Sequence, residues 1–265
     1  QARVLLRAAA TGEVPVVRAV SLTAHPAPPR ARTPAAEART HRVFATRVGL
    51  VGASTANGHV IRERDHFVAL PSRRGLSPRG TGDYSVKVCA GNGRCAWAAV
   101  RDVGPWNTRD DYWNPSSVRQ NWADLPRGRP QAQAAFQEGH NGGLDQYGRR
   151  VRNPAGIDLG DGTFRDALRL TDNSWVTVTY LWTGHGPAGT VVTPGIPLNV
   201  RATPDTTLPP VGLAGDDAML RLQCQAHGRS ATGSQGTTDL WLRLSPGYWV
   251  SRAHVSAPAL PFCPR

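Results

Sequence analysis

The sequence predicts an all-β protein, in which a β-barrel domain with a helical insertion is followed by a second, smaller β-barrel. Several short segments are rich in β-branched and aromatic residues, and the clearest, residues 175–182, alternates them. Most helix signals lie between Trp106 and Gly156. Beyond a glycine-rich hinge at residues 184–189, turn residues separate further short strands at close intervals, a pattern typical of a small barrel.

Length and charge limit the classes of partner. The chain has 265 residues, enough for two domains and a tail, and a net charge of +12. This charge favours acidic partners such as anionic cell-wall polymers or nucleic acid. No basic run with interleaved aromatic residues is present, which argues against a nucleic-acid site. No apolar stretch reaches the length of about 18 residues that a membrane span needs.

The four cysteines form two pairs in the sequence, Cys89 with Cys95 and Cys224 with Cys263. Neither pair has the spacing of a metal site, so we expect two local disulfides, no metal and no cofactor. The chain starts at Gln1, and we expect that an N-terminal segment has been removed. The sequence therefore predicts a secreted monomer.

The first 41 residues are rich in Ala, Pro and Arg and indicate a linker or pro-segment, with a short strand at 16–20. The barrel domain is expected at 42–185, with strands at 42–48, 65–71, 84–89, 94–102 and 175–182. Residues 95–100 are all apolar, which predicts a strand buried on most of both faces. Gly104-Pro105 ends it, so Asp102 lies where a buried strand meets a loop, either as a working carboxylate or as a cap of the turn.

The insertion at about 106–155 carries two predicted helices. One begins at Asn114-Pro115 and extends to Asp124, and the other covers residues 130–138 and ends at Gly139. A short third helix is expected at 161–168. The second domain, at 190–265, has predicted strands at 198–201, 219–224, 240–244 and 248–251.

Several motifs, in order, resemble known families. Residues 101–106 (RDVGPW) resemble the Asn-Asp-Arg-Gly-Pro-Phe motif of the rare lipoprotein A family, and residues 156–160 (GIDLG) resemble segments of that family and of expansins. His66 before residues 69–71 (ALP) is similar to a further segment. The resemblance implies a six-stranded double-psi β-barrel. Leu198-Asn199-Val200-Arg201 resembles the opening of bacterial SH3 domains, which implies an SH3-like second domain.

The same resemblance implies that Asp102 and Asp158 face one groove, with Asp158 as the catalytic acid. Repulsion between two neighbouring charges would keep one carboxyl protonated at neutral pH. A protonated aspartate can protonate a glycosidic oxygen. In a lytic transglycosylase the same carboxylate then removes a hydroxyl proton, whereas in a hydrolase the second carboxylate activates water. His66 is expected to polarise or position Asp158, with a purely structural role as the alternative.

Aromatic residues of the insertion are candidates for stacking on sugars, and Trp106, Tyr112 and Trp113 lie closest to Asp102 in the sequence. The alternative is that such rings form a small core of the insertion. The adjacent carboxylates Asp110 and Asp111 are interpreted as solvated loop residues, with cation binding as the alternative.

Three function classes follow. The first is a secreted cell-wall protein that binds, and as an enzyme would cleave, peptidoglycan or a related polysaccharide, held to the wall by its SH3-like domain. The second is a non-catalytic binder, such as a protease inhibitor or an expansin-like wall-loosening protein. A substrate or matrix protein of the secreted layer is a third possibility. The sequence leaves open whether the protein is an enzyme.

Overall fold

The computed structural model describes residues 37–245 and 247–264. The strand expected at residues 16–20, and all but the end of the expected N-terminal segment, lie outside the described residues.

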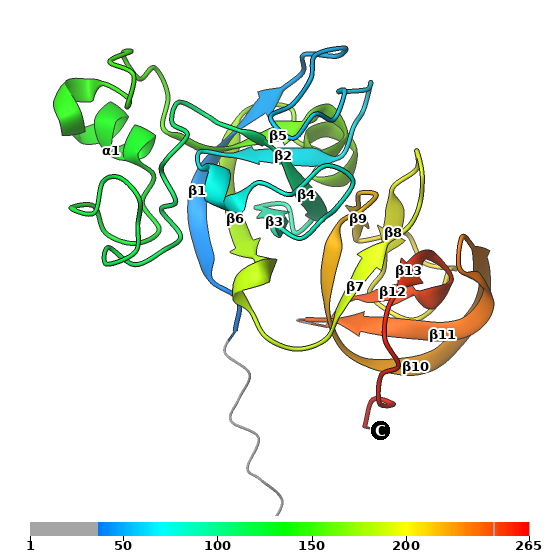
Figure 1. Cartoon of the computed structure of the whole chain (residues 1–265). Helices are drawn as coiled ribbons and strands as arrows, with labels where there is room; N and C mark the ends of the chain where they lie inside the picture. The colour runs from blue at the N-terminus through cyan, green and yellow to red at the C-terminus, as the bar shows by residue number, and fades with distance from the viewer. Residues whose placement is uncertain (1–36, 246, 265) are drawn as a thin grey trace, which may run out of the picture. The chain divides into compact units, whose positions relative to one another are not determined.

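Six strands close into a barrel, shown in Figure 1. Their order is β2-β5-β1-β6-β3-β4, and a further pairing of β2 with β4 closes the ring. The β1–β5 and β2–β4 pairs are parallel, and the other neighbours are antiparallel. The strands are β1 (Thr40–Val48), β2 (Phe67–Leu70), β3 (Ser85–Ala90), β4 (Cys95–Val103), β5 (Ala155–Gly160) and β6 (Ser174–Tyr180). The six-stranded barrel is confirmed, and its double-psi connectivity stays a prediction.

Strand β4 is buried on both faces, as the sequence predicts. Ala96, Ala98 and Val100 belong to the barrel core. Cys95 and Trp97 face the other way and belong to a second core, formed with residues of the C-terminal region. A strand with cores on both faces has no solvated side, which explains why its sequence is almost continuously apolar.

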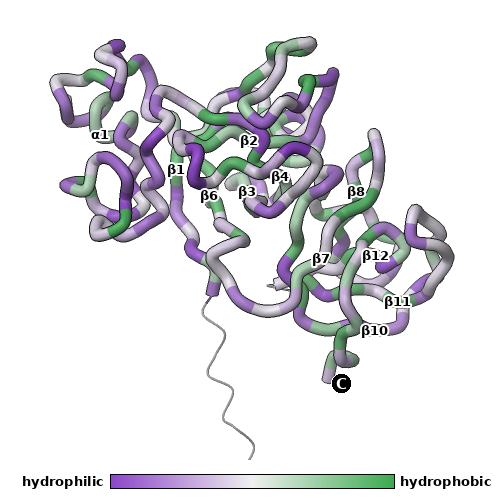
Figure 2. Tube along the Cα trace, viewed as in Figure 1, coloured by the Kyte–Doolittle hydropathy of each residue, from purple (hydrophilic) through white to green (hydrophobic). Residues whose placement is uncertain are grey.

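The colouring of Figure 2 shows both hydrophobic and hydrophilic residues along the barrel as a whole.

The C-terminal region contains a second, five-stranded sheet with the order β12-β11-β10-β7-β13. Strands β8 and β9 instead extend the sheet of the barrel, because β9 pairs parallel with β4 and β8 pairs antiparallel with β9. The segment expected to open an SH3-like domain is therefore hydrogen-bonded into the sheet of the barrel. The strands are β7 (Ala188–Val191), β8 (Leu198–Val200), β9 (Gly212–Ala214), β10 (Met219–Gly233), β11 (Gly236–Leu244), β12 (Trp249–Ser251) and β13 (Val255–Ser256). An SH3-like architecture stays a prediction.

The insertion between β4 and β5 contains one α-helix, α1 (Gln131–Glu138), surrounded by loops in Figure 1. The helix ends at Gly139, whose φ of 70° is left-handed, so the prediction for 130–138 is confirmed. The helix expected at 114–124 is wrong. There the Asp111 carboxylate accepts hydrogen bonds from the Asn114 side chain and the Gln120 backbone, which holds the segment as successive turns.

The remaining helical elements are single turns. The helix expected at 161–168 is confirmed as a π-helical turn, η3. The turns are η1 (Arg73–Gly75), η2 (His140–Gly143), η3 (Gly162–Ala167), η4 (Leu181–Thr183) and η5 (Arg252–His254). Among the described residues, no helix is long and apolar enough to cross a membrane.

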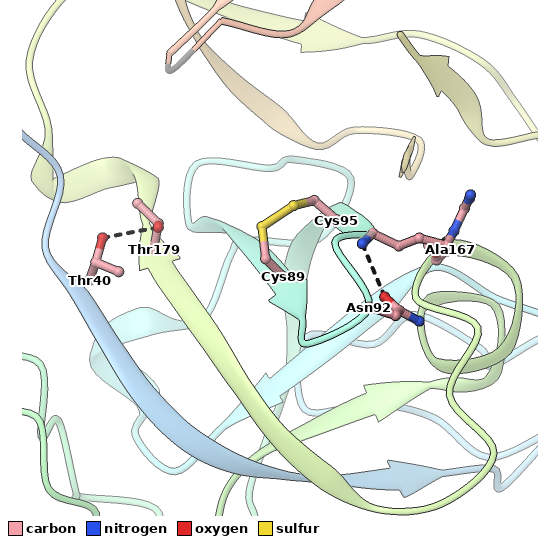
Figure 3. Close-up of a disulfide and its surroundings, with 7 residues drawn as sticks. Thr40, Cys89, Asn92, Cys95, Ala167 and Thr179 are labelled. Atoms are coloured by element: carbon pink, nitrogen blue, oxygen red, sulfur yellow. Dashed lines mark hydrogen bonds between the residues drawn. A yellow bond between two sulfur atoms is a disulfide. The ribbon is translucent and has the colours of Figure 1, made fainter. Parts of the chain in front are cut away.

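Both predicted disulfides are present. Cys89 and Cys95 are directly opposed in the β3–β4 ladder, and their bond closes the hairpin shown in Figure 3. Within the hairpin turn the Arg94 N–H donates to the side-chain oxygen of Asn92 over 3.0 Å. Cys224 and Cys263 join β10 to the C-terminal end of the chain.

Candidate functional site

Asp102 and Asp158 lie on two strands that flank the same residue. Ala69 of β2 pairs with Asp102 of β4 on one side and with Asp158 of β5 on the other. Residues opposed across a ladder project their side chains to the same face. The fold therefore brings together the two carboxylates that the sequence singles out, although they are 56 positions apart in the sequence.

Asp158 is half-buried as a residue, and the acidity of its carboxyl is perturbed. Burial raises its pKa to about 6, a hydrogen bond from the Thr46 hydroxyl opposes this rise, and the charge of Asp102 adds to it. The sequence predicts that repulsion between the two carboxylates keeps one of them protonated. In the structure burial is the larger cause of the raised pKa, and repulsion contributes less.

Thr46 is the member of this site that sequence reasoning missed. It lies opposite Asp158 in the parallel β1–β5 ladder, and its side chain is 9% exposed. Its hydroxyl donates to Oδ1 of Asp158. No local motif marks it, because the register of β1 against β5 depends on residues more than one hundred positions apart.

Asp102 uses its carboxylate to hold the surrounding backbone. One oxygen, Oδ1, accepts the N–H groups of Ala56 and Val103, each over 2.8 Å. The bond to Val103 is the turn cap that the sequence analysis offered as an alternative. The bond to Ala56 also fixes the loop between β1 and β2 beside the strand end.

Gly104 places backbone without a side chain next to Asp158. A Cβ at Gly104 would lie 3.7 Å from Oδ2 of Asp158, so any side chain there would extend over the carboxyl group. The next peptide bond, between Gly104 and Pro105, is cis. The chain therefore passes close to Asp158 as bare backbone.

Trp106 follows this turn and is held from several sides while part of its surface stays exposed. Its indole N–H donates to Oδ1 of Asn153 over 3.0 Å, and its carbonyl accepts from Arg149 over 2.6 Å. The ring packs against a small cluster of Ala132, Ala135 and Val151. Trp106 thus combines a fixed position with partial exposure.

Tyr112 and Trp113 do not lie where the sequence analysis placed them. They are 0% and 1% exposed and belong to the barrel core, so they cannot stack on a sugar. The Tyr112 hydroxyl donates to the Gly156 carbonyl over 2.9 Å, and Trp113 stacks on Tyr180 at 5.3 Å between ring centroids. These rings anchor the insertion to the barrel.

His66 does not contact Asp158 either. Its Nε2 lies 4.0 Å from Oδ2 of Asp166, which also pairs with Arg64. Burial lowers the pKa of His66 to about 4, so the ring is neutral at physiological pH. This environment fits the purely structural role that is the alternative for His66.

The neighbouring carboxylates Asp110 and Asp111 are neither solvated nor arranged around a cation. Both are 0% exposed and ion-paired, Asp110 with Arg119 at 2.5 Å and Asp111 with Arg74 at 2.9 Å. Burial raises the pKa of Asp110 to about 6, against the effect of Arg119. Within residues 37–245 and 247–264, no group of three or more His, Cys, Asp or Glu residues is arranged to hold a metal ion.

A family model described as "Domain of unknown function (DUF8814)" matches residues 39–179, which include β1 to β6 almost completely. No curated protein matches the chain. Among solved structures, a variant of the Clavibacter michiganensis expansin in complex with cellohexaose is similar, with 12% sequence identity and a TM-score of 0.27. That comparison covers 85% of this chain and 99% of the expansin chain. Because the family model spans more than half of the sequence, the chain belongs to the family of unknown function DUF8814.

Proposed function

We propose that this protein binds a cell-wall polysaccharide, such as peptidoglycan, across the barrel face that carries Asp158, and that Asp158 donates a proton to a glycosidic oxygen. The observation that supports the proposal is the half-buried Asp158, beside Asp102 on the same face, with a carboxyl whose pKa burial raises to about 6. A general acid works best when its pKa is near the ambient pH, because it then holds its proton and can still release it.

Neighbouring residues are suited to this role. The Thr46 hydroxyl orients the Asp158 carboxyl by donating to Oδ1, and Gly104 places no side chain near Oδ2. Trp106 offers a fixed and partly exposed aromatic surface next to the turn that follows Asp102. Aromatic faces are apolar and rigid, so they can support a sugar ring at little entropic cost.

The engagement of Asp102 favours a mechanism with one carboxyl over hydrolysis with two. Its Oδ1 accepts two backbone N–H groups, so Asp102 supports the turn rather than activating water. In a one-carboxyl mechanism, Asp158 protonates the leaving oxygen, and its carboxylate then accepts the proton of a hydroxyl of the same sugar. That hydroxyl oxygen bonds to the anomeric carbon as the glycosidic bond breaks, which gives an anhydro product without water.

The two disulfides favour an oxidising compartment, in keeping with a secreted wall protein. The net charge of +12 would also favour retention on an anionic wall.

The test is incubation of the native protein and the Asp158→Asn variant with purified peptidoglycan, with separate measurement of soluble sugar products and of co-sedimented protein. Asp172→Asn, at an exposed aspartate of the same domain, is the matched control. The proposal predicts binding by all three proteins and anhydro-ended products from the native and control proteins only. Binding without products from any protein would remove the proton-donor role, and absence of binding would overturn the proposal entirely.

A further inference from the structure

A polar cavity of about 620 Å³ lies in the insertion, apart from the Asp158 carboxyl. Its lining includes the guanidinium-bearing residues Arg73 and Arg109, the exposed ring of Tyr147, and Thr108 and Gln146, with two further amide side chains. No acidic residue lines it.

The segment that follows Asp102 connects the candidate site to the cavity. The Gly104 N–H donates to the Leu70 carbonyl over 3.0 Å, and a few residues later the Arg73 N–H donates to the Thr108 carbonyl over 3.2 Å. An isolated bridge also pairs Ser72 with Arg109. The turn after Asp102 and the rim of the cavity are thus two parts of one segment that runs beside the end of β2.

Internal hydrogen bonds fix the shape of the cavity. Oε1 of Gln146 accepts the N–H groups of Thr108 and Arg109 over 3.0 and 3.1 Å. The Tyr147 hydroxyl is 2.7 Å from the Thr108 hydroxyl, and the Arg149 guanidinium lies 5.1 Å from the centroid of the Tyr147 ring. A preformed site loses less conformational entropy when it binds a ligand.

The charges around the cavity are unbalanced. The nearby acids Asp110, Asp111 and Asp145 are 0%, 0% and 1% exposed, and each pairs with an arginine other than Arg73 and Arg109. Over the part of the chain that the structure describes, no ion pair involves Arg73 or Arg109. Two arginines therefore line the cavity without an ion pair to a protein carboxylate among the described residues.

We infer that this cavity is a subsite for an acidic sugar unit of the bound polysaccharide. Arg73 and Arg109 bind its carboxylate, and the Tyr147 ring lies against its apolar face. The inference rests on the proposed function and adds to it a preference for anionic over neutral polysaccharide. Arginine suits this task because its planar guanidinium can donate two parallel hydrogen bonds to one carboxylate. The carboxylate can belong to a uronic acid or to a lactyl ether on an amino sugar.

The experiment compares two oligosaccharides that differ only at C6 of each sugar, where oxidation replaces a neutral group with a carboxylate. Binding of the full chain to cellohexaose and to its C6-oxidised form, a hexamer of glucuronate, is measured by calorimetry at fixed ionic strength. We expect the oxidised hexamer to bind about tenfold more tightly or better. A muramic-acid-containing glycan strand, measured in the same way, shows whether a lactyl carboxylate is accepted as well as a uronate.

The variants Arg73→Gln and Arg109→Gln each remove one charge and keep a polar side chain. Each should reduce the affinity for the oxidised hexamer about tenfold and leave cellohexaose binding unchanged. The control is Arg127→Gln, which makes the same change at an exposed arginine of the insertion outside the cavity lining. Equal binding of both hexamers, or unchanged affinity in both arginine variants, overturns this inference alone. Absence of binding to any of these glycans overturns the proposed function with it.

Discussion

Thr46 and Asp158 face each other across a parallel strand pair, and the threonine hydroxyl donates a hydrogen bond to the aspartate carboxylate. This bond stabilises the ionised form of a carboxyl whose pKa burial raises to about 6. The protonation state of Asp158 therefore depends on two opposing effects, burial and the Thr46 hydrogen bond, of which burial is the larger.

The variant Thr46→Val removes the hydroxyl and keeps the shape of a side chain that is 9% exposed. Because the lost hydrogen bond favours the ionised carboxylate, the pKa of Asp158 should rise further above its value of about 6. The pH above which products cease to form should rise with it, as measured by product release over pH 4 to pH 9. The Thr46→Ser variant keeps a hydroxyl and should behave like the native protein. An identical pH profile in Thr46→Val would show that the bond has no influence.

The stability of the protein should depend on the charge of Asp158. Its folded pKa of about 6 is above the ordinary aspartate value of 3.8, so the folded state binds the proton more tightly than the unfolded state. This contribution to stability is fully present below about pH 4 and is lost as the pH rises through about 6. Asp158→Asn cannot ionise, so its free energy of unfolding relative to native should increase by about 1–3 kcal/mol between pH 4 and pH 8. Urea titrations at both pH values measure this difference, and a constant difference would contradict the raised pKa.

Alanine substitution of two tryptophans of the insertion should affect different properties, stability for Trp113 and polysaccharide binding for Trp106. Trp113 is 1% exposed in the barrel core, so Trp113→Ala should cost about 3–5 kcal/mol of stability. Trp106 is partly exposed, so Trp106→Ala should weaken polysaccharide binding by about threefold to tenfold and affect stability less. Chemical denaturation and calorimetry separate the two effects. Unchanged binding in folded Trp106→Ala would remove that ring from the proposed site.

The two disulfides should contribute unequally to stability. Cys224 and Cys263 are 39 positions apart, whereas Cys89 and Cys95 are 6 apart. A longer closed loop restricts the unfolded chain more, so Cys224→Ser/Cys263→Ser should cost about 4 kcal/mol and Cys89→Ser/Cys95→Ser about 2 kcal/mol. Thermal unfolding of the two double variants tests this order. The reverse order would show that native-state effects outweigh loop length.

The sequence predicted those features that local pattern determines. The positions of β1, β3, β4 and β6 follow from β-branched and apolar segments, and the end of α1 follows from Gly139. The burial of β4 on both faces follows from its almost continuous apolar run.

Features that depend on contacts between distant residues could not be predicted. The helix signal at Asn114-Pro115 is overridden by the Asp111 side chain, and Trp113 is buried because Tyr180, far along the chain, stacks on it. The sequence does not reveal the partner of His66 or the contact between Thr46 and Asp158, because both depend on how separate segments pack together.

The proton-donor role of Asp158 is tested most directly by an NMR titration of its carboxyl carbon in the full chain, assigned by the loss of the signal in Asp158→Asn. We expect a midpoint of about 6, because burial disfavours the charged form. A midpoint at or below 3.8, the ordinary value for aspartate, would rule out this role, since Asp158 would then be fully ionised at neutral pH and unable to donate a proton.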